Sequence, residues 1–149
     1  MGRLTLIRHG QSIWNLQNRF TGWIDVSLSE QGVKEAQQAA ALLADQHFDR
    51  AFTSSLLRAQ DTLYEILKQN RHCNHYLRIH ETGREWYEHF KPTGEHVLIS
   101  AHGNSLRAII MQLEHLSAEQ ILAYELKTGA PHIYELDEQM QIMEKHILN

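Results

Sequence analysis

Two short apolar runs along this chain of 149 residues each end in the same dipeptide. The run Leu4–Ile7 leads through an arginine to His9-Gly10, and the run Val97–Ala101 leads to His102-Gly103. Apolar runs of this length between turn residues are typical of buried strands. Each is followed by small polar residues and then by a helix-compatible stretch. We therefore expect both histidines at the carboxyl end of a sheet, which is where open α/β folds bind phosphate-bearing ligands.

Apolar residues at helical spacing predict two amphipathic helices between these runs. Ser29 is a candidate N-cap, Glu30 follows it in the first turn, and the helix is expected from about Glu30 to Asp45. The second helix carries Arg58 in its first turn. Its apolar positions are Leu56, Leu57, Leu63, Ile66 and Leu67.

The remaining segments alternate between strand and helix patterns. Strands are predicted at 49–54, 76–79, 96–101 and 132–136, and helices at 105–113 and from Ser117 onward. Alternation of this kind indicates parallel strands joined by crossover helices. The pattern therefore predicts an α/β fold, a three-layer sandwich with a mostly parallel central sheet and helices on both faces. The length suits one domain covering residues 1–149.

Composition narrows the classes of function. The chain is 42% hydrophobic and 21% charged, and no apolar run approaches the roughly 20 residues of a membrane span. The net charge of −4 and the lack of a basic block argue against nucleic-acid binding. Cys73 is the single cysteine, so an intrachain disulfide is excluded. We expect a cytoplasmic protein that binds no membrane, because the amino terminus enters a strand directly.

The eleven histidines of the chain raise the question of a metal site. None of them forms a helix-borne His-x-x-x-His motif or lies beside cysteines at zinc-finger spacing. We therefore expect no metal. The histidines considered for this role are His72, His75, His80, His89 and His96.

The two His-Gly corners have a direct chemical interpretation. A neutral imidazole, with a pKa of about 6.5, is a nucleophile toward phosphorus at neutral pH and can become a phosphohistidine. A second histidine and fixed arginines can stabilise the charge on the transferring phosphoryl group. In an acidic chain, an anionic substrate requires such a local cluster, and Arg8 and Arg58 are the candidates.

Longer motifs around these residues resemble the histidine phosphatase superfamily, and specifically its 2,3-bisphosphoglycerate-dependent phosphoglycerate mutases. The resemblance runs almost from end to end of the chain. The motifs that carry it are Arg8-His9-Gly10-Gln11-Ser12, Asn15, Arg19-Phe20-Thr21-Gly22-Trp23, Leu28-Ser29-Glu30-Gln31-Gly32, Thr53-Ser54-Ser55-Leu56-Leu57-Arg58-Ala59, Ala101-His102-Gly103-Asn104-Ser105-Leu106-Arg107 and Thr128-Gly129-Ala130-Pro131.

The resemblance implies a role for each matching position. His9 is the phosphorylated nucleophile, and Arg8, Arg58 and His102 clamp the phosphoryl group. Glu81 is the general acid and base, in a stretch that resembles the family's Arg-Leu-Asn-Glu. Further contacts to phosphate or substrate come from Asn15, Thr21, Gly22, Gly103 and Asn104. The family also implies 2,3-bisphosphoglycerate as phosphoryl primer, a small phosphomonoester substrate and possible association into a homodimer.

The resemblance fails just after Glu81. Family mutases continue there through a long insertion that covers the site, whereas this chain has only residues 82–93 before the next strand region. A mutase must keep water away from its phosphohistidine, and a phosphatase must admit it. Interconversion of 3- and 2-phosphoglycerate is the first hypothesis, and phosphomonoester hydrolysis is the alternative. A weakly active phosphate-binding protein is a second alternative.

Overall fold

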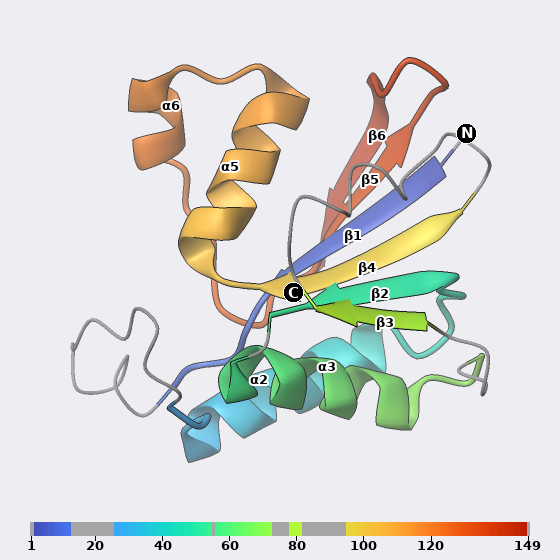
Figure 1. The fold of residues 1–149 in the computed structure, drawn as a ribbon, viewed down its shortest axis with the longest axis vertical. Coiled ribbons are helices and arrows are strands. Elements are labelled where there is room, and N and C mark those ends of the chain that lie inside the picture. Colours follow the sequence, from blue (N-terminus) through green and yellow to red (C-terminus); the bar gives the residue numbers. More distant parts are fainter. Residues whose placement is uncertain (1, 13–25, 55, 73–77, 82–94, 149) are drawn as a thin grey trace.

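The computed structural model describes residues 2–12, 26–54, 56–72, 78–81 and 95–148, and for residues 78–81 it describes the backbone only. Within this part of the chain, six strands form one sheet in the order β3-β2-β4-β1-β5-β6 (Figure 1). The strands are β1 (Gly2–Arg8), β2 (Arg50–Thr53), β3 (Arg78–Glu81), β4 (His96–Ala101), β5 (His132–Leu136) and β6 (Ile142–Ile147).

The first four neighbours in the sheet, β3, β2, β4 and β1, are parallel, and β5 pairs antiparallel with both β1 and β6. The pairing aligns the carboxyl ends of the parallel strands. Ile7 of β1 lies opposite Ser100 of β4, which lies opposite Thr53 of β2, and Thr53 pairs with Glu81 of β3. Side chains that follow these positions are therefore brought to one edge of the sheet, as the His-Gly corners predicted.

Helices cover both faces of the sheet, which confirms the three-layer arrangement (Figure 1). Helices α2 (Glu30–Leu42) and α3 (Leu57–Gln69) pack on one face, around a core that includes Ile7 and Leu98. Helices α5 (Gly103–Glu114) and α6 (Ala118–Leu122) pack on the other face, around Leu4 and Leu6. Alternate residues of β1 thus supply the two cores, as the twofold period of a strand requires.

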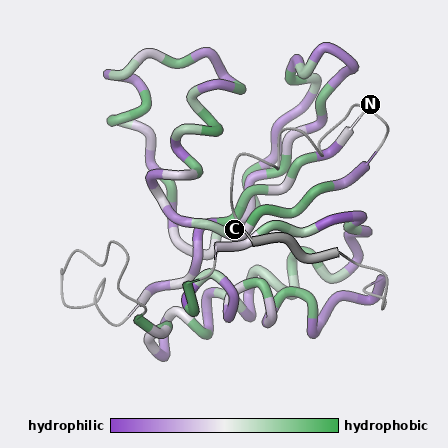
Figure 2. Tube along the Cα trace, in the orientation of Figure 1, coloured by the Kyte–Doolittle hydropathy of each residue, from purple (hydrophilic) through white to green (hydrophobic). Residues whose placement is uncertain are grey.

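The most hydrophobic strands lie in the middle of the sheet, between the two layers of helices. All six residues of β4 are buried, and the central strands β1 and β4 are hydrophobic along most of their length (Figure 2). Continuous apolar strands are expected where parallel strands are covered on both faces. The described residues include no helix long and apolar enough to cross a membrane.

Local caps explain where several helices begin. The Ser29 side chain accepts a hydrogen bond from Gly32 N and caps α2, as predicted. Ser117 caps α6 in a capping box with Gln120. The predicted strands 96–101 and 132–136 are found at those bounds.

Other boundaries differ from the predictions. Helix α2 ends at Leu42 instead of Asp45, and α5 begins at Gly103 instead of Ser105 because His102 is its N-cap. The strand expected at 76–79 lies at 78–81, where it pairs with β2, and residues 76 and 77 lie outside the described part. Strand β6 was not predicted. Its residues show no apolar alternation, since it is an edge strand with much of its surface exposed.

Candidate active site

His9 lies in the turn that follows β1 and is only 4% exposed. Its Nδ1 atom is 2.7 Å from the carbonyl oxygen of Gly10. A carbonyl oxygen only accepts hydrogen bonds, so Nδ1 carries the hydrogen in this contact. In the neutral ring, Nε2 is therefore the atom with the lone pair. The backbone thus presents His9 in the tautomer that a nucleophile attacking through Nε2 requires.

The surroundings of His9 keep its ring neutral. The pKa of His9 is lowered to about 3, chiefly by burial, with smaller contributions from the charges of His102, Arg58 and Arg8. The contact with the Gly10 carbonyl opposes this shift because it favours the protonated ring. At neutral pH the Nε2 lone pair is therefore not blocked by a proton, and the ring is available for nucleophilic attack.

His102 lies beside His9 at the end of the neighbouring strand. The two ring centroids are 5.0 Å apart, with the planes at 60°. Burial, followed by the charges of Arg58 and Arg8, lowers the pKa of His102 to about 4. Its Nε2 atom is 2.7 Å from the Ser54 hydroxyl oxygen. Its Nδ1 atom is buried and has no hydrogen-bond partner in the described part of the chain.

Arginines make the electrostatic potential at this edge positive. Arg58, in the first turn of α3, is only 2% exposed. Arg8 donates from Nη1 to the carbonyl of Leu126 at 3.0 Å, while its Nε atom is buried without a hydrogen-bond partner among the described residues. Burial, followed by the charge of nearby Arg107, lowers the pKa of Arg8, whereas the charge of Glu35 acts in the opposite direction. One buried and two partly buried guanidinium groups at the same edge favour the binding of an anion.

Glycines allow the backbone to approach these side chains. A Cβ atom on Gly103 would lie 2.9 Å from Nη1 of Arg107 and 3.3 Å from Nε of Arg8. Gly103 also begins α5, whose amino terminus carries partial positive charge and unsatisfied N–H groups. The described edge thus combines two neutral imidazoles, three guanidinium groups and a helix amino terminus, a set of groups suited to a phosphoryl group.

Comparisons with known proteins identify the family. The family model of the histidine phosphatase superfamily (branch 1) matches residues 4–89. A 2,3-bisphosphoglycerate-dependent phosphoglycerate mutase of Pseudoalteromonas atlantica is 45% identical over 226 aligned positions, which cover 99% of this chain and 100% of the relative. The chain belongs to the histidine phosphatase superfamily.

Further relatives agree with this assignment. A second mutase of the same description, from Gloeobacter violaceus, is 37% identical over 91% of this chain and 86% of its own length. The crystal structure of the alpha-ribazole phosphatase from Shigella flexneri shares the fold with a TM-score of 0.77 at 22% identity, over 99% of this chain and 96% of that one. The sequence comparisons thus place the chain in a family of enzymes, and the structural comparison shows the same fold.

Several of the predicted site residues lie together in the structure, and others lie outside its described part. His9, His102, Arg8, Arg58 and Gly103 lie at one edge of the sheet, and Asn104 is exposed in the first turn of α5. The backbone of Glu81 reaches the same edge through its pairing with Thr53. The side chain of Glu81 lies outside the description, as do three further predicted residues, namely Asn15, Thr21 and Gly22.

The sequence did not reveal the supporting role of Glu35. Its carboxylate accepts the backbone N–H of Gln11 at 2.7 Å and the Thr128 hydroxyl at 2.9 and 3.0 Å. It thereby joins the loop after His9 to the segment before β5. Gly129 packs against Glu35 with a φ of 71°, a conformation that favours glycine. The sequence signal was limited to the Thr-Gly-x-Pro motif, which does not point to a glutamate 93 residues away.

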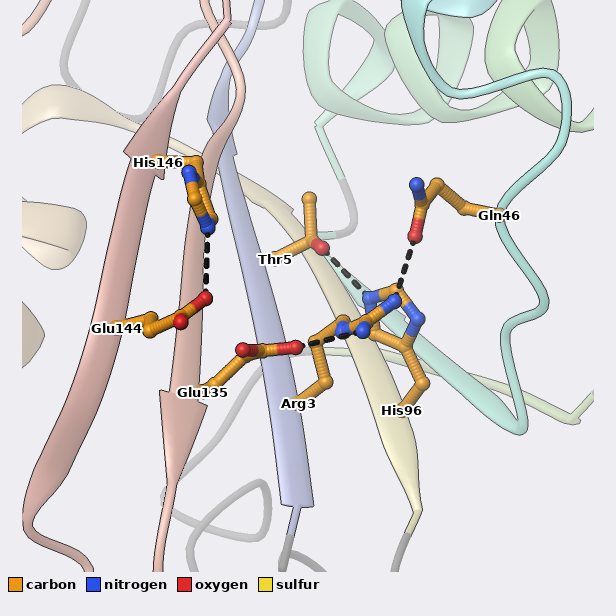
Figure 3. A network of polar contacts seen from close by, with 7 residues as sticks. All are labelled: Arg3, Thr5, Gln46, His96, Glu135, Glu144 and His146. Carbon is orange, nitrogen blue, oxygen red and sulfur yellow. Dashed lines mark hydrogen bonds and ion pairs between the residues drawn. The ribbon is translucent and has the colours of Figure 1, made fainter.

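A second polar network lies at the opposite end of β1 and β4, beside an open cavity of about 570 Å³ (Figure 3). Ligand atoms of Glu135, Glu144 and His146 lie within 4.8 Å of one another there. Each carboxylate already has a basic neighbour. Arg3 donates to Glu135 at 2.6 Å, and His146 lies 3.2 Å from Glu144. These contacts form a partly exposed polar network, distant in the fold from the two His-Gly corners.

Proposed function

We propose that this protein transfers phosphoryl groups through a phosphohistidine formed at Nε2 of His9. The observation that carries the proposal is the contact between His9 Nδ1 and the Gly10 carbonyl, which leaves the Nε2 lone pair on a buried, neutral ring. Positive groups surround that ring. The arrangement therefore supplies both a nucleophile and stabilisation for the charge on a phosphoryl group.

The proposed roles follow from this geometry and from the family resemblance. Arg8, Arg58 and His102 bind the oxygens of the phosphoryl group during transfer, and the amino terminus of α5 adds backbone N–H donors at Gly103 and Asn104. Glu81 exchanges a proton with the leaving or attacking oxygen, a function that requires a carboxyl group beside the reacting ester. Contacts to the rest of the substrate are assigned to Asn15, Thr21 and Gly22.

We further propose interconversion of 3- and 2-phosphoglycerate as the reaction, because the relatives with up to 45% identity are named phosphoglycerate mutases. The same relatives are named as dependent on 2,3-bisphosphoglycerate. The residues present fit a phosphoryl group of that molecule, since the N–H at Arg8 Nε is a buried donor and His102 Nδ1 is a buried ring nitrogen, and neither atom has a hydrogen-bond partner in the described structure. When bound, this primer supplies the phosphoryl group that His9 accepts.

Hydrolysis of a phosphomonoester is the second candidate function. The alignment with the Pseudoalteromonas atlantica relative spans 226 positions, although this chain has only 149 residues. The relative therefore contains residues that this chain lacks, and we place the missing segment after Glu81. A shorter cover over His9 admits water, which then accepts the phosphoryl group in place of a second hydroxyl of the substrate.

The test is phosphorus NMR of 3-phosphoglycerate incubated with the protein and a trace of 2,3-bisphosphoglycerate. Formation of 2-phosphoglycerate is expected, and release of inorganic phosphate would establish the hydrolytic function instead. His9→Ala should abolish either product, whereas His146→Ala, in the exposed network, should leave the rate unchanged. If neither product forms with the wild-type protein, phosphoglycerate is not the substrate, and a phosphate-binding role without turnover gains support.

A further inference from the structure

We propose that Ser54 is a positioning residue that sets the tautomer and the orientation of His102. The inference rests on the proposed function, because it concerns how His102 meets a phosphoryl group. Neither the family motifs nor the residue types assigned a role to this serine. Its position explains why: Ser54 follows β2, whereas His102 lies 48 residues later, after β4.

Ser54 is only 7% exposed, and its hydroxyl group has two contacts within the protein. The backbone N–H of Leu56 donates to Ser54 Oγ at 3.2 Å, a local contact typical of the turn that precedes a helix. This donor occupies one acceptor position of Oγ and orients the hydroxyl group. The hydroxyl hydrogen remains, and Nε2 of His102 lies 2.7 Å from the same oxygen. The hydroxyl can therefore donate to Nε2 in a fixed direction.

The other ring nitrogen of His102, Nδ1, lies buried beside His9. Because the ring is neutral at pH 7, with a pKa of about 4, a single nitrogen carries the hydrogen. If Nε2 accepts from Ser54, the hydrogen lies on Nδ1. That atom is buried and has no partner among the described residues, although the ring packs 5.0 Å from His9. Nδ1 is then a donor in place for an oxygen of the phosphoryl group that His9 receives.

The resulting chain of hydrogen bonds runs in one direction. Leu56 N–H donates to Ser54, Ser54 O–H donates to His102 Nε2, and His102 Nδ1–H is left for the ligand. The same hydroxyl also serves the protonated ring. If a bound dianion draws a proton onto His102, Ser54 Oγ accepts from Nε2–H with its second acceptor position. The serine thus holds the imidazole in place in either state of charge.

The first measurement is nitrogen NMR of the histidine rings in the resting protein at pH 7. We expect Nδ1 of His102 to be protonated and Nε2 to be bare in the wild-type protein. In Ser54→Ala, which lacks the hydroxyl donor, both tautomers should be populated. Ser54→Thr retains a hydroxyl group and should restore the single tautomer, and Ser27→Ala, at an exposed position, should match the wild type. A bare Nδ1 in the wild-type protein would overturn the proposal.

The second measurement connects the tautomer to function. In Ser54→Ala, the affinity for inorganic phosphate and the kcat for phosphoryl transfer should each fall by about two- to tenfold, because part of the protein holds His102 in the wrong tautomer and the ring loses one orienting hydrogen bond. Ser54→Thr should recover most of both. Equal losses in the two variants would assign the effect to packing and refute the positioning role, as would unchanged values in Ser54→Ala. If the wild-type protein transfers no phosphoryl group, the proposed function fails, but the NMR measurement still decides the role of Ser54.

Discussion

Gly32 lies in the first turn of α2, outside the two His-Gly corners, and yet its substitution by alanine should disable the site. A Cβ atom at this position would lie 2.8 Å from both the backbone N and the carbonyl carbon of Gln11, and closer still to its carbonyl oxygen. These atoms belong to the backbone, so no flexible side chain can move away. The loop that carries His9 would have to shift.

Two opposing effects determine the size of the change. Replacing a glycine inside a helix by alanine normally stabilises the folded protein by about 1 kcal/mol. Overpacking a close contact costs about 1–3 kcal/mol. We therefore expect net destabilisation of up to about 2 kcal/mol. To relieve the contact, the Gln11 backbone has to move by a distance on the order of 1 Å, and a misplacement of catalytic groups by that distance can lower the catalysed rate roughly 100-fold. The effect on kcat should thus be much larger than the effect on stability.

The assay combines urea unfolding with the phosphoryl-transfer rate of Gly32→Ala. The control is Gln38→Ala, which changes an exposed position on the same helix and should leave both measurements close to the wild type. A Gly32→Ala protein that is stabilised by about 1 kcal/mol and retains full kcat would refute the reasoning. It would mean that the loop after β1 tolerates displacement, and that the close contact does not position His9.

Two further predictions concern stability. His9 and His96 have pKa values lowered to about 3 and about 4 by burial, so at pH 4–6.5 the unfolded chain binds protons that the folded chain excludes. The free energy of unfolding should therefore reach its full value above pH 6.5 and fall by several kcal/mol as the pH is lowered toward 4. Urea unfolding at pH 7 and at pH 4.5 measures this difference. Equal free energies of unfolding at the two pH values would contradict the prediction. Lys145 donates to Glu114 at 2.9 Å, so Lys145→Met should cost about 1–3 kcal/mol, whereas the exposed control Lys68→Met should cost little. A double-mutant cycle with Glu114→Gln that gives no coupling would exclude this contact as the cause.

Patterns of local sequence were sufficient to predict the layers of this fold. The apolar runs of β1 and β4 are buried on both faces, so their continuous hydrophobic character was a direct signal. The positions of β5 and α2 followed from alternation and from the Ser29 cap. Strand β6 lacked such a signal. As an edge strand, it is held by β5 and by contacts such as Lys145 with Glu114, which depend on the folded arrangement.

The candidate site likewise contains residues that the sequence predicts and residues that only the structure reveals. His9 and His102 could be predicted because each follows a recognisable strand at the sheet edge that binds ligands. Ser54 and Glu35 could not, because their significance lies in hydrogen bonds to residues 48 and 93 positions away. A serine after a strand and a glutamate on a helix are common in any sequence. Only the folded geometry distinguishes them as the residues that orient His102 and fix the loop after His9.

The most direct test of the central claim is a search for phosphate bound to His9. The protein would be mixed briefly with 2,3-bisphosphoglycerate, quenched at alkaline pH and digested, and the peptide that contains His9 analysed by mass spectrometry. We predict a phosphoryl group on His9 that is absent from His9→Ala and that disappears when excess 3-phosphoglycerate or time for hydrolysis is allowed. Phosphoryl transfer observed without phosphate on His9, or with phosphate on another residue, would contradict the account.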